Sequence, residues 1–246
     1  MLLSLDRIGM HHVALSGEVA EALVDVSFDL DAGQFLSIVG PSGSGKSTLL
    51  NLIAGVYTPT SGSIQYSGGK LPHLGYLLQS NALFPWRTVR RNLTYSNDLR
   101  RISREQSDTE ATELCRQLGL DPQAYLDKYP RELSGGEQRR VALGMAVAMA
   151  PAILLLDEPG SQLDYKAKWA IQRLVQEIAM RHRFAVICVT HDLEEAVFLG
   201  DRVIVLNAGR VEDRVEIDLP RPRRNELRTS AQFNAYIKRL MGEQSN

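Results

Sequence analysis

The chain has little cysteine and almost no net charge. Its 246 residues include two cysteines, Cys115 and Cys188, and the formal net charge is −1. Two isolated cysteines exclude a disulfide framework and a cysteine-based zinc site, and they favour a reducing compartment such as the cytosol. The balanced charge excludes a protein whose overall field recruits nucleic acid or an anionic membrane surface.

Long apolar runs are also missing. The apolar residues 1–5 end at Asp6 and Arg7, before the apolar region of a signal peptide could form, so export is not expected. The longest stretch without charge, residues 141–156, is shorter than the roughly 18 residues of a membrane span and contains Pro151. We expect a helix that ends before Pro151, then a buried central strand, and a protein that reaches a membrane only through partners.

Residues 40–47 form a glycine-rich string, GPSGSGKS, that fits the pattern G-x-x-x-x-G-K-[ST]. Such a loop, opening a helix, turns several backbone N–H groups toward the phosphate oxygens of a nucleotide triphosphate. Lys46 adds a charge for the β and γ phosphates, and Ser47 supplies a hydroxyl for the Mg²⁺ that accompanies ATP. We predict a strand over residues 35–39 and a helix over residues 46–54. The candidate ATP-binding residues of the loop are Gly40, Pro41, Ser42, Gly43, Ser44, Gly45, Lys46, Ser47 and Thr48.

Two adjacent carboxylates, Asp157 and Glu158, follow the apolar residues 153–156. In an extended chain neighbouring side chains face opposite ways, so the two groups can take different roles. Phosphoryl transfer needs a divalent ion and a group that orients the attacking nucleophile, and a pair of carboxylates can serve both needs. The alternative is an ordinary solvent-facing acidic pair, which the phosphate loop in the same chain argues against.

The string LSGGEQ occupies residues 133–138, between the phosphate loop and the acidic pair. We expect Ser134 to cap a helix that has Glu137 in its first turn. The helix terminus formed by Ser134, Gly135 and Gly136 would then be a second place where backbone N–H groups can bind an anion. The sequence therefore predicts two separate anion-binding helix termini.

The order of sequence patterns predicts an α/β protein. Residues 2–31 alternate apolar and polar side chains around short turns, as antiparallel strands do. From residue 33 to about residue 79, and again from about residue 152, strands alternate with helices as in a parallel sheet. A polar, helix-rich insertion at about residues 81–150 separates these parts and carries LSGGE at the start of its last helix.

The three strings, in this order, resemble the ATP-binding subunit of ABC transporters over nearly the whole chain. NALFPWRTVRRNL (residues 81–93) and LPRPRRNELRTSAQF (residues 219–233) are most similar to the ATPases of nitrate, sulfonate and taurine importers. The resemblance implies one ABC ATPase domain over residues 1–246. Its parts are a RecA-like P-loop NTPase core with an N-terminal antiparallel β subdomain (residues 1–80 and 152–215), an inserted helical subdomain (residues 81–151) and a C-terminal tail (residues 216–246).

The resemblance also implies roles for single residues in the hydrolysis of Mg·ATP. Asp157 would hold Mg²⁺ through water, and Glu158 would polarise the attacking water. Gln79, after the strand-like HLGYLL, would contact Mg²⁺ or that water and relay the nucleotide state to the transmembrane subunit. His191, after the apolar residues 184–190, would sense the γ-phosphate.

In the resembling family the LSGGE string serves the nucleotide held by another copy of the ATPase. This chain has one phosphate loop and one LSGGE. The resemblance therefore implies a homodimer that encloses two Mg·ATP between copies facing head to tail. Asp164, in the loop after the acidic pair, would cross between the two sites. The residues implied to act on the partner's nucleotide are Ser134, Gly135, Gly136 and Glu137.

Three places depart from the family pattern. The family usually has an aromatic residue upstream of the phosphate loop to stack on adenine, whereas residues 8–23 contain no Tyr, Phe or Trp. His12 is the best candidate, because an imidazole can stack with a smaller area; the alternative is a solvated loop residue. Gln162 is unusual in its loop, and Gly144 with Met145 replaces a common Ala-Arg pair, which indicates close packing or drift.

The segment around Phe84, Pro85 and Trp86 is the expected docking surface. Exposed aromatic and arginine side chains anchor interfaces, and in the resembling family this region receives a short cytoplasmic helix of the permease. The alternative is that both rings belong to the core. The arginine cluster at residues 221–224 is expected to be a solvated tail.

Three functions are compatible with these strings. The first is an importer ATPase that energises uptake of a small oxyanion with two membrane subunits and an extracytoplasmic solute-binding protein. The second is the ATPase of an exporter or lipoprotein-release system, which would carry the same catalytic strings. The third is an ABC ATPase that acts outside transport. The LFPWRTV segment favours the importer.

Overall fold

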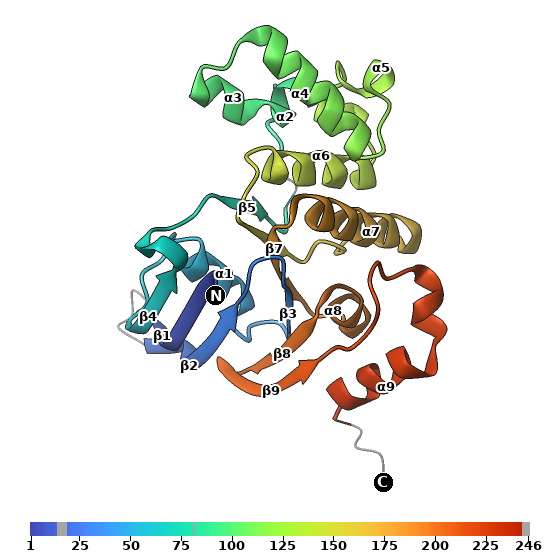
Figure 1. The fold of residues 1–246 in the computed structure, drawn as a ribbon. Helices are drawn as coiled ribbons and strands as arrows, with labels where there is room; N and C mark the ends of the chain where they lie inside the picture. The colour runs from blue at the N-terminus through green and yellow to red at the C-terminus, as the bar shows by residue number, and fades with distance from the viewer. Residues whose placement is uncertain (14–18, 81, 243–246) are drawn as a thin grey trace.

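The computed structural model describes residues 1–13, 19–80 and 82–242 and places them in two sheets with a helical part at one end (Figure 1). Within this part of the chain, the larger sheet has the strand order β5-β6-β7-β3-β8-β9 and the smaller sheet the order β2-β1-β4. The predicted α/β fold class is confirmed. The strands are β1 (Leu3–Val13), β2 (Val19–Leu30), β3 (Phe35–Val39), β4 (Ser61–Tyr66), β5 (Leu74–Leu77), β6 (Ile153–Asp157), β7 (Ala185–Thr190), β8 (Arg202–Asn207) and β9 (Arg210–Glu216).

The central strands of the larger sheet are fully buried. β5, β6, β7, β3 and β8 pair in parallel, and β9 pairs antiparallel with β8. Every residue of β3, β6 and β7 is buried, as expected of parallel strands covered on both faces. Apolar residues of α6 (Gly135–Val147), α7 (Tyr165–His182) and α8 (Leu193–Leu199) pack on one face of this sheet, and those of α1 (Lys46–Ile53) pack on the other. The carboxyl ends of these strands meet at one edge.

The smaller sheet is antiparallel, as predicted for residues 2–31, but it also contains β4, so the prediction of a parallel sheet for residues 33–79 is wrong for this strand. β1 pairs with β2 on one side and with β4 on the other. Its apolar side chains share one buried cluster with those of α1 and of the larger sheet. The smaller sheet therefore packs on the core rather than standing apart from it. The helix α1 (Lys46–Ile53) begins where predicted and ends one residue early, and β3 has the predicted bounds.

The helical part lies between β5 and β6 in sequence and forms the end of the molecule farthest from β1, β2 and β4 (Figure 1). Asn81, the first residue of the predicted insertion, lies outside the described residues. Buried Gly144 faces Leu93 and Leu118, where a Cβ atom would meet side-chain carbons at 2.5 and 2.6 Å. Close packing therefore explains this glycine. The helices are α2 (Val89–Leu93), α3 (Tyr95–Arg100), α4 (Arg104–Gln117), α5 (Pro122–Tyr125) and α6 (Gly135–Val147), with a 3₁₀ turn η2 (Pro130–Glu132).

The C-terminal segment packs on the core, and the prediction of a solvated arginine cluster is wrong for Arg223. Its side chain is fully buried and donates to the carbonyl oxygens of Val197 at 2.7 Å and Gly200 at 2.6 Å. The last turn of a helix leaves such carbonyls without helical partners, so the guanidinium satisfies the end of α8. The elements involved are α7 (Tyr165–His182), α8 (Leu193–Leu199), the 3₁₀ turn η3 (Asn225–Thr229) and α9 (Ala231–Leu240).

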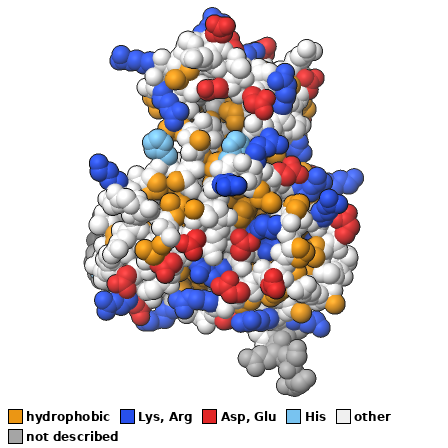
Figure 2. All heavy atoms as spheres, viewed as in Figure 1, with side chains coloured by type: hydrophobic (Ala, Val, Ile, Leu, Met, Phe, Trp, Pro, Cys, Tyr) orange, Lys and Arg blue, Asp and Glu red, His pale blue; other side chains and the backbone are white. Residues whose placement is uncertain are grey.

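The uncharged stretch before the acidic pair divides as predicted. α6 ends at Val147, before Pro151, and β6 begins at Ile153. Across the described residues, none of the helices combines the length and the apolar character needed to cross a membrane. Charged side chains of both signs are interspersed over the face shown in Figure 2, in keeping with the small net charge.

Candidate functional site

The phosphate loop connects β3 with α1, which is the context that its sequence predicts. Gly40 lies so close to β8 that a Cβ atom would be 1.9 Å from the carbonyl oxygen of Leu206. Gly45, the N-cap of α1, has a φ of 95°. Both positions therefore need glycine. Lys46 curls back over the loop, where its Nζ donates to the carbonyl oxygens of Gly40 at 2.9 Å and Pro41 at 2.8 Å.

A cavity of about 310 Å³ opens over this loop. Lys46 is 7% exposed at its wall, and burial lowers the pKa of its ammonium group while the nearby carboxylates Glu158 and Asp157 oppose that shift. The cavity brings the loop together with Gln79 and Glu158, which come from distant parts of the sequence. Its lining residues are Ala22, Ser42, Gly43, Gly45, Lys46, Ser47, Thr48, Gln79 and Glu158.

Ser47 and Asp157 lie side by side beneath the cavity. The Ser47 hydroxyl donates to Asp157 Oδ1 at 3.3 Å, and Asp157 is almost fully buried at the end of β6. Burial raises the pKa of Asp157, while the Ser47 hydrogen bond and the Lys46 charge work to lower it. A hydroxyl and a carboxylate, with further oxygens from water and phosphate, form the kind of donor set that Mg²⁺ takes in nucleotide sites. These two side chains therefore fit the ion.

Glu158 is the meeting point of the site's polar side chains. It leaves β6 with a φ of 47°, so the extended geometry assumed for the acidic pair holds for Asp157 and ends there. Its carboxylate accepts from Gln79 Nε2 at 3.1 Å and lies 3.0 Å from His191 Nδ1. β6 and β7 are neighbours in the sheet, so the residues that follow them meet. The predicted Gln79, Glu158 and His191 are thus brought together.

Arg139, which the sequence analysis missed, holds the backbone of this site. It is 2% exposed on α6 and, among the described residues, donates to the carbonyl oxygens of Leu78, Gln79, Asp157, Glu158 and Pro159, at distances of 2.5 to 3.2 Å. The backbone at Leu78 and Gln79 and the backbone of the acidic pair are therefore held by the same guanidinium. No signal in the sequence separates Arg139 from its neighbour Arg140, because both are arginines in the polar first half of α6.

The LSGGE residues form a well-capped helix start at some distance from the cavity. Ser134 caps α6 by accepting from the Glu137 backbone, and the Glu137 carboxylate accepts from the Ser134 N–H and hydroxyl, each at 2.8 Å. A hydrogen bond from the Tyr125 hydroxyl lowers the pKa of Glu137. Neither Ser134 nor Gly135 is among the residues that line the phosphate cavity. Gly136 does not line it either.

Two further predicted residues have defined places in the backbone. Asp164 is the N-cap of α7 and accepts from the Ala167 N–H at 3.0 Å, and the unusual Gln162 before it has a φ of 61°. His12 belongs to β1 opposite Ala20, so its backbone is in a strand and not in a loop. The side chain of His12 lies outside the described residues, so the adenine contact stays a prediction.

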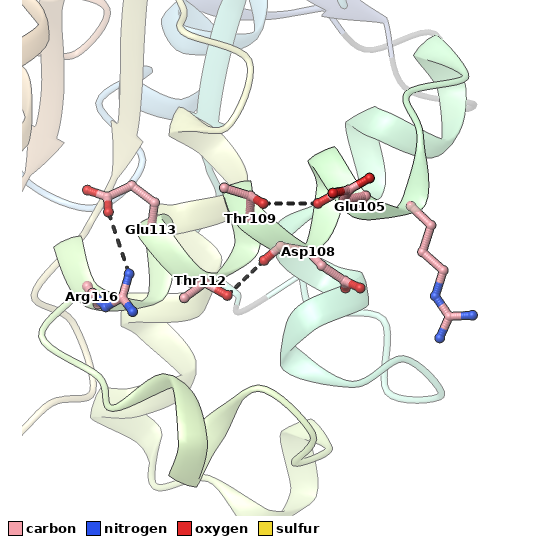
Figure 3. A pocket seen from close by; sticks show the side chains of 7 residues that line it. Glu105, Asp108, Thr109, Thr112, Glu113 and Arg116 are labelled. Carbon is pink, nitrogen blue, oxygen red and sulfur yellow. Dashed lines mark hydrogen bonds and ion pairs between the residues drawn. The ribbon is translucent and has the colours of Figure 1, made fainter.

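A second hollow, on the outer face of α4, has a different character (Figure 3). Thr109 and Thr112 donate to carbonyl oxygens of their own helix, at 3.0 and 2.7 Å, and Arg116 pairs loosely with Glu113 at 3.9 Å. These polar groups are satisfied within one exposed helix. The hollow has neither a glycine-rich loop nor a buried charge, so the chemistry belongs to the cavity over the phosphate loop.

The glycine-rich loop, the acidic strand end and the buried lysine define a nucleotide-hydrolysing P-loop site. The family described as ABC transporter matches residues 23–161, and the chain belongs to this family as an ATP-binding, ATP-hydrolysing subunit. It is 40% identical over 230 residues to aliphatic sulfonates import ATP-binding protein SsuB 2 of Agrobacterium fabrum, covering 92% of this chain and 85% of that protein. It is 41% identical over 211 residues to nitrate import ATP-binding protein NrtC of Synechococcus elongatus, covering 82% of this chain and 32% of that protein.

A solved structure supports the same assignment. It is described as the dimeric structure of a post-hydrolysis state of the ATP-binding cassette MJ0796 bound to ADP and Pi. Its TM-score is 0.79 at 30% sequence identity, and the match covers 89% of this chain and all of that chain. The fold described above is therefore the fold of an ABC ATPase cassette.

Proposed function

We propose that the protein is the ATPase of an ABC importer for a small oxyanion of the nitrate, aliphatic sulfonate or taurine type. The observation that carries the proposal is the similarity to relatives named for sulfonate and nitrate import, at 40% and 41% identity. The protein would act on the cytoplasmic face of the membrane with two permease subunits, and indirectly with an extracytoplasmic solute-binding protein. Substrate contacts would lie in those partners, so the ATPase would respond only to their change of shape.

The polar side chains in and beside the cavity have proposed roles in hydrolysis. Ser47 and Asp157 would hold Mg²⁺, which would neutralise phosphate charge when bound. When ATP binds, Lys46 would give up its hydrogen bonds to the carbonyl oxygens of Gly40 and Pro41 and donate to the β and γ phosphates instead. Glu158, held by Gln79 and His191, would orient the attacking water and accept a hydrogen bond from it.

We further propose a homodimer in which Ser134, Gly135 and Gly136 complete the site of the other copy. The support is that these residues do not line the chain's own cavity, although their helix terminus is well formed for an anion. A related cassette is described as a dimer bound to ADP and Pi. In this arrangement Asp164, at the start of α7, would lie between the two sites.

The proposed permease contact is an aromatic patch on the helical part. Trp86 is 72% exposed, so the alternative that both rings belong to the core does not hold for Trp86. Its ring lies 5.7 Å from that of Phe84, which is half-buried against Tyr95 at 4.7 Å. The Arg87 guanidinium lies over the rings of Phe84 and Tyr95. Exposed tryptophan beside arginine is the composition of an interface anchor.

The test is co-purification. Tagged Glu158→Gln protein is isolated with Mg·ATP from gently solubilised membranes, and its partners are identified by mass spectrometry. The importer predicts a multispanning permease together with a binding protein. In the same background Trp86→Ala should lose the permease, whereas Leu71→Ala, a matched loss of an exposed apolar side chain outside the patch, should retain it.

The other two functions give different results in the same experiment. A permease without a binding protein would favour an exporter or lipoprotein-release system. Soluble partners alone, or no partner, would favour an ABC ATPase that acts outside transport. Retention of the permease by Trp86→Ala would contradict the proposed contact but not the importer.

A further inference from the structure

The C-terminal segment places a second buried arginine, besides Arg223, against the core helices α7 and α8. Arg228, in η3, has a side chain that is 5% exposed. Its guanidinium lies 4.0 Å from the ring centre of Phe198 on α8 and 5.0 Å from that of Trp169 on α7. A cation held between two aromatic rings is stabilised by both. Arg228 therefore joins α7, which follows the loop of Asp164, and α8, which follows His191.

A chain of hydrogen bonds continues from Arg228 into the core. Arg228 Nη2 donates to Gln172 Oε1 on α7, and Gln172 Nε2 donates to Glu195 Oε1 on α8 at 2.9 Å. Gln172 and Glu195 are 0% and 1% exposed. Because an amide has one acceptor end and one donor end, the Arg228 bond fixes which end of Gln172 faces Glu195. A buried carboxylate without that donor would be costly.

Glu195 in turn contacts the segments that follow Glu158 and His191. Its N–H donates to Asp192 Oδ1 at 3.0 Å, and Asp192, next to His191, pairs with Lys168. A Cβ atom at Gly160, two residues after Glu158, would lie 2.6 Å from Glu195 Oε1. The loop that follows Glu158 thus packs directly on the Glu195 carboxylate.

We propose that Arg228 is a positioning residue for hydrolysis, acting through Gln172 and Glu195 on the loops that carry Glu158 and His191. The inference rests on the proposed role of His191. Through Arg228, the C-terminal segment would then influence the rate of ATP turnover. None of the residues that line the phosphate cavity contacts Arg228 in the described chain, so ATP binding should be spared.

The test compares Arg228→Met with Arg224→Met. Both variants replace the guanidinium side chain of an arginine in the same segment by the unbranched apolar side chain of methionine. Arg224, unlike Arg228, is exposed. We expect Arg228→Met to lower kcat about fivefold or more with KM for ATP within about twofold, and Arg224→Met to leave both unchanged. Arg228→Lys, which keeps one donor for Gln172, should recover part of kcat. Thermal unfolding checks that the variants are folded at the assay temperature.

Two further variants separate the possible outcomes. Gln172→Leu breaks the same chain, so its effect on kcat should not add to that of Arg228→Met in the double variant. Equal losses of kcat and of ATP affinity, or an unchanged kcat in a folded Arg228→Met protein, would overturn the positioning role. His191→Ala is measured beside them: if it abolishes turnover while Arg228→Met leaves kcat unchanged, the inference fails and the proposed site stands.

Discussion

At the scale of single residues, Glu158 makes the most specific prediction. Glu158→Gln keeps the size of the side chain and its contact with Gln79, but an amide polarises water far less than a carboxylate. We expect ATP hydrolysis to fall by about a hundredfold or more while ATP binding is retained. Phosphate release and equilibrium nucleotide binding are the two measurements. Hydrolysis near the wild-type rate would remove Glu158 from its proposed role.

Arg139 makes a prediction about stability. Replacing it with methionine removes one donor from each of the backbone carbonyls of Leu78, Gln79, Asp157, Glu158 and Pro159, of which Glu158 still accepts from Ser161. Unmade buried hydrogen bonds cost about 1–3 kcal/mol each, and partial relaxation leaves an expected loss of about 3 kcal/mol in the free energy of unfolding. Urea unfolding measures it. Arg140→Met, one residue along with hydrogen bonds of 3.4 Å, should cost less than about 1 kcal/mol.

The buried carboxyl group of Glu195 should make the free energy of unfolding depend on pH. Burial is the main cause that raises its pKa above the ordinary value of 4.5, so the folded protein binds its proton more tightly than the unfolded chain does. Its contribution to stability is therefore present below that ordinary value and is lost as pH rises through the raised pKa. Glu195→Gln should be more stable than wild type at neutral pH, and the difference should shrink as the solution is acidified toward pH 4.5. A difference that grows on acidification would contradict this.

At the scale of elements, α6 shows packing that overrides helix propensity. An alanine in place of glycine within a helix gains about 1 kcal/mol from propensity alone. At Gly144, however, the added Cβ atom would meet Leu93 and Leu118, which are both buried. We expect Gly144→Ala to lower the unfolding free energy by about 1–3 kcal/mol, as overpacking does. Gly135→Ala, at the open start of the same helix, should be neutral or slightly stabilising; a stabilising Gly144→Ala would refute the packing explanation.

The elements also show what a sequence can predict here. β3 and α1 were predictable because the glycine-rich string requires a strand before it and a helix after it. Glu158 and His191 meet because they follow β6 and β7, which are adjacent in the sheet. The family resemblance implied this arrangement, but residue patterns alone do not give the order of strands in a sheet. Arg139 and Arg223 were not found because their burial depends on backbone carbonyls contributed by distant segments. The sequence shows a charge at these positions but not the carbonyls that satisfy it.

At the scale of the whole molecule, the phosphate cavity and the capped helix terminus at Ser134 are separate in the described chain, because Ser134 does not line the cavity. The account requires that the two meet only between copies. Ser134→Arg should therefore leave ATP binding by a single chain intact while blocking the paired state with a bulky charge. Ser103→Arg is the matched control, because Ser103 caps α4 in the same way, with its hydroxyl accepting from the Gln106 N–H.

The most direct measurement is the mass of the Glu158→Gln protein in solution by size-exclusion light scattering, with and without Mg·ATP. The account predicts one chain without nucleotide and two chains with it, with pairing lost on adding Ser134→Arg and kept on adding Ser103→Arg. A protein that binds ATP yet stays a single chain, or that pairs equally well with Ser134→Arg, would contradict the central claim that each copy completes the other's site.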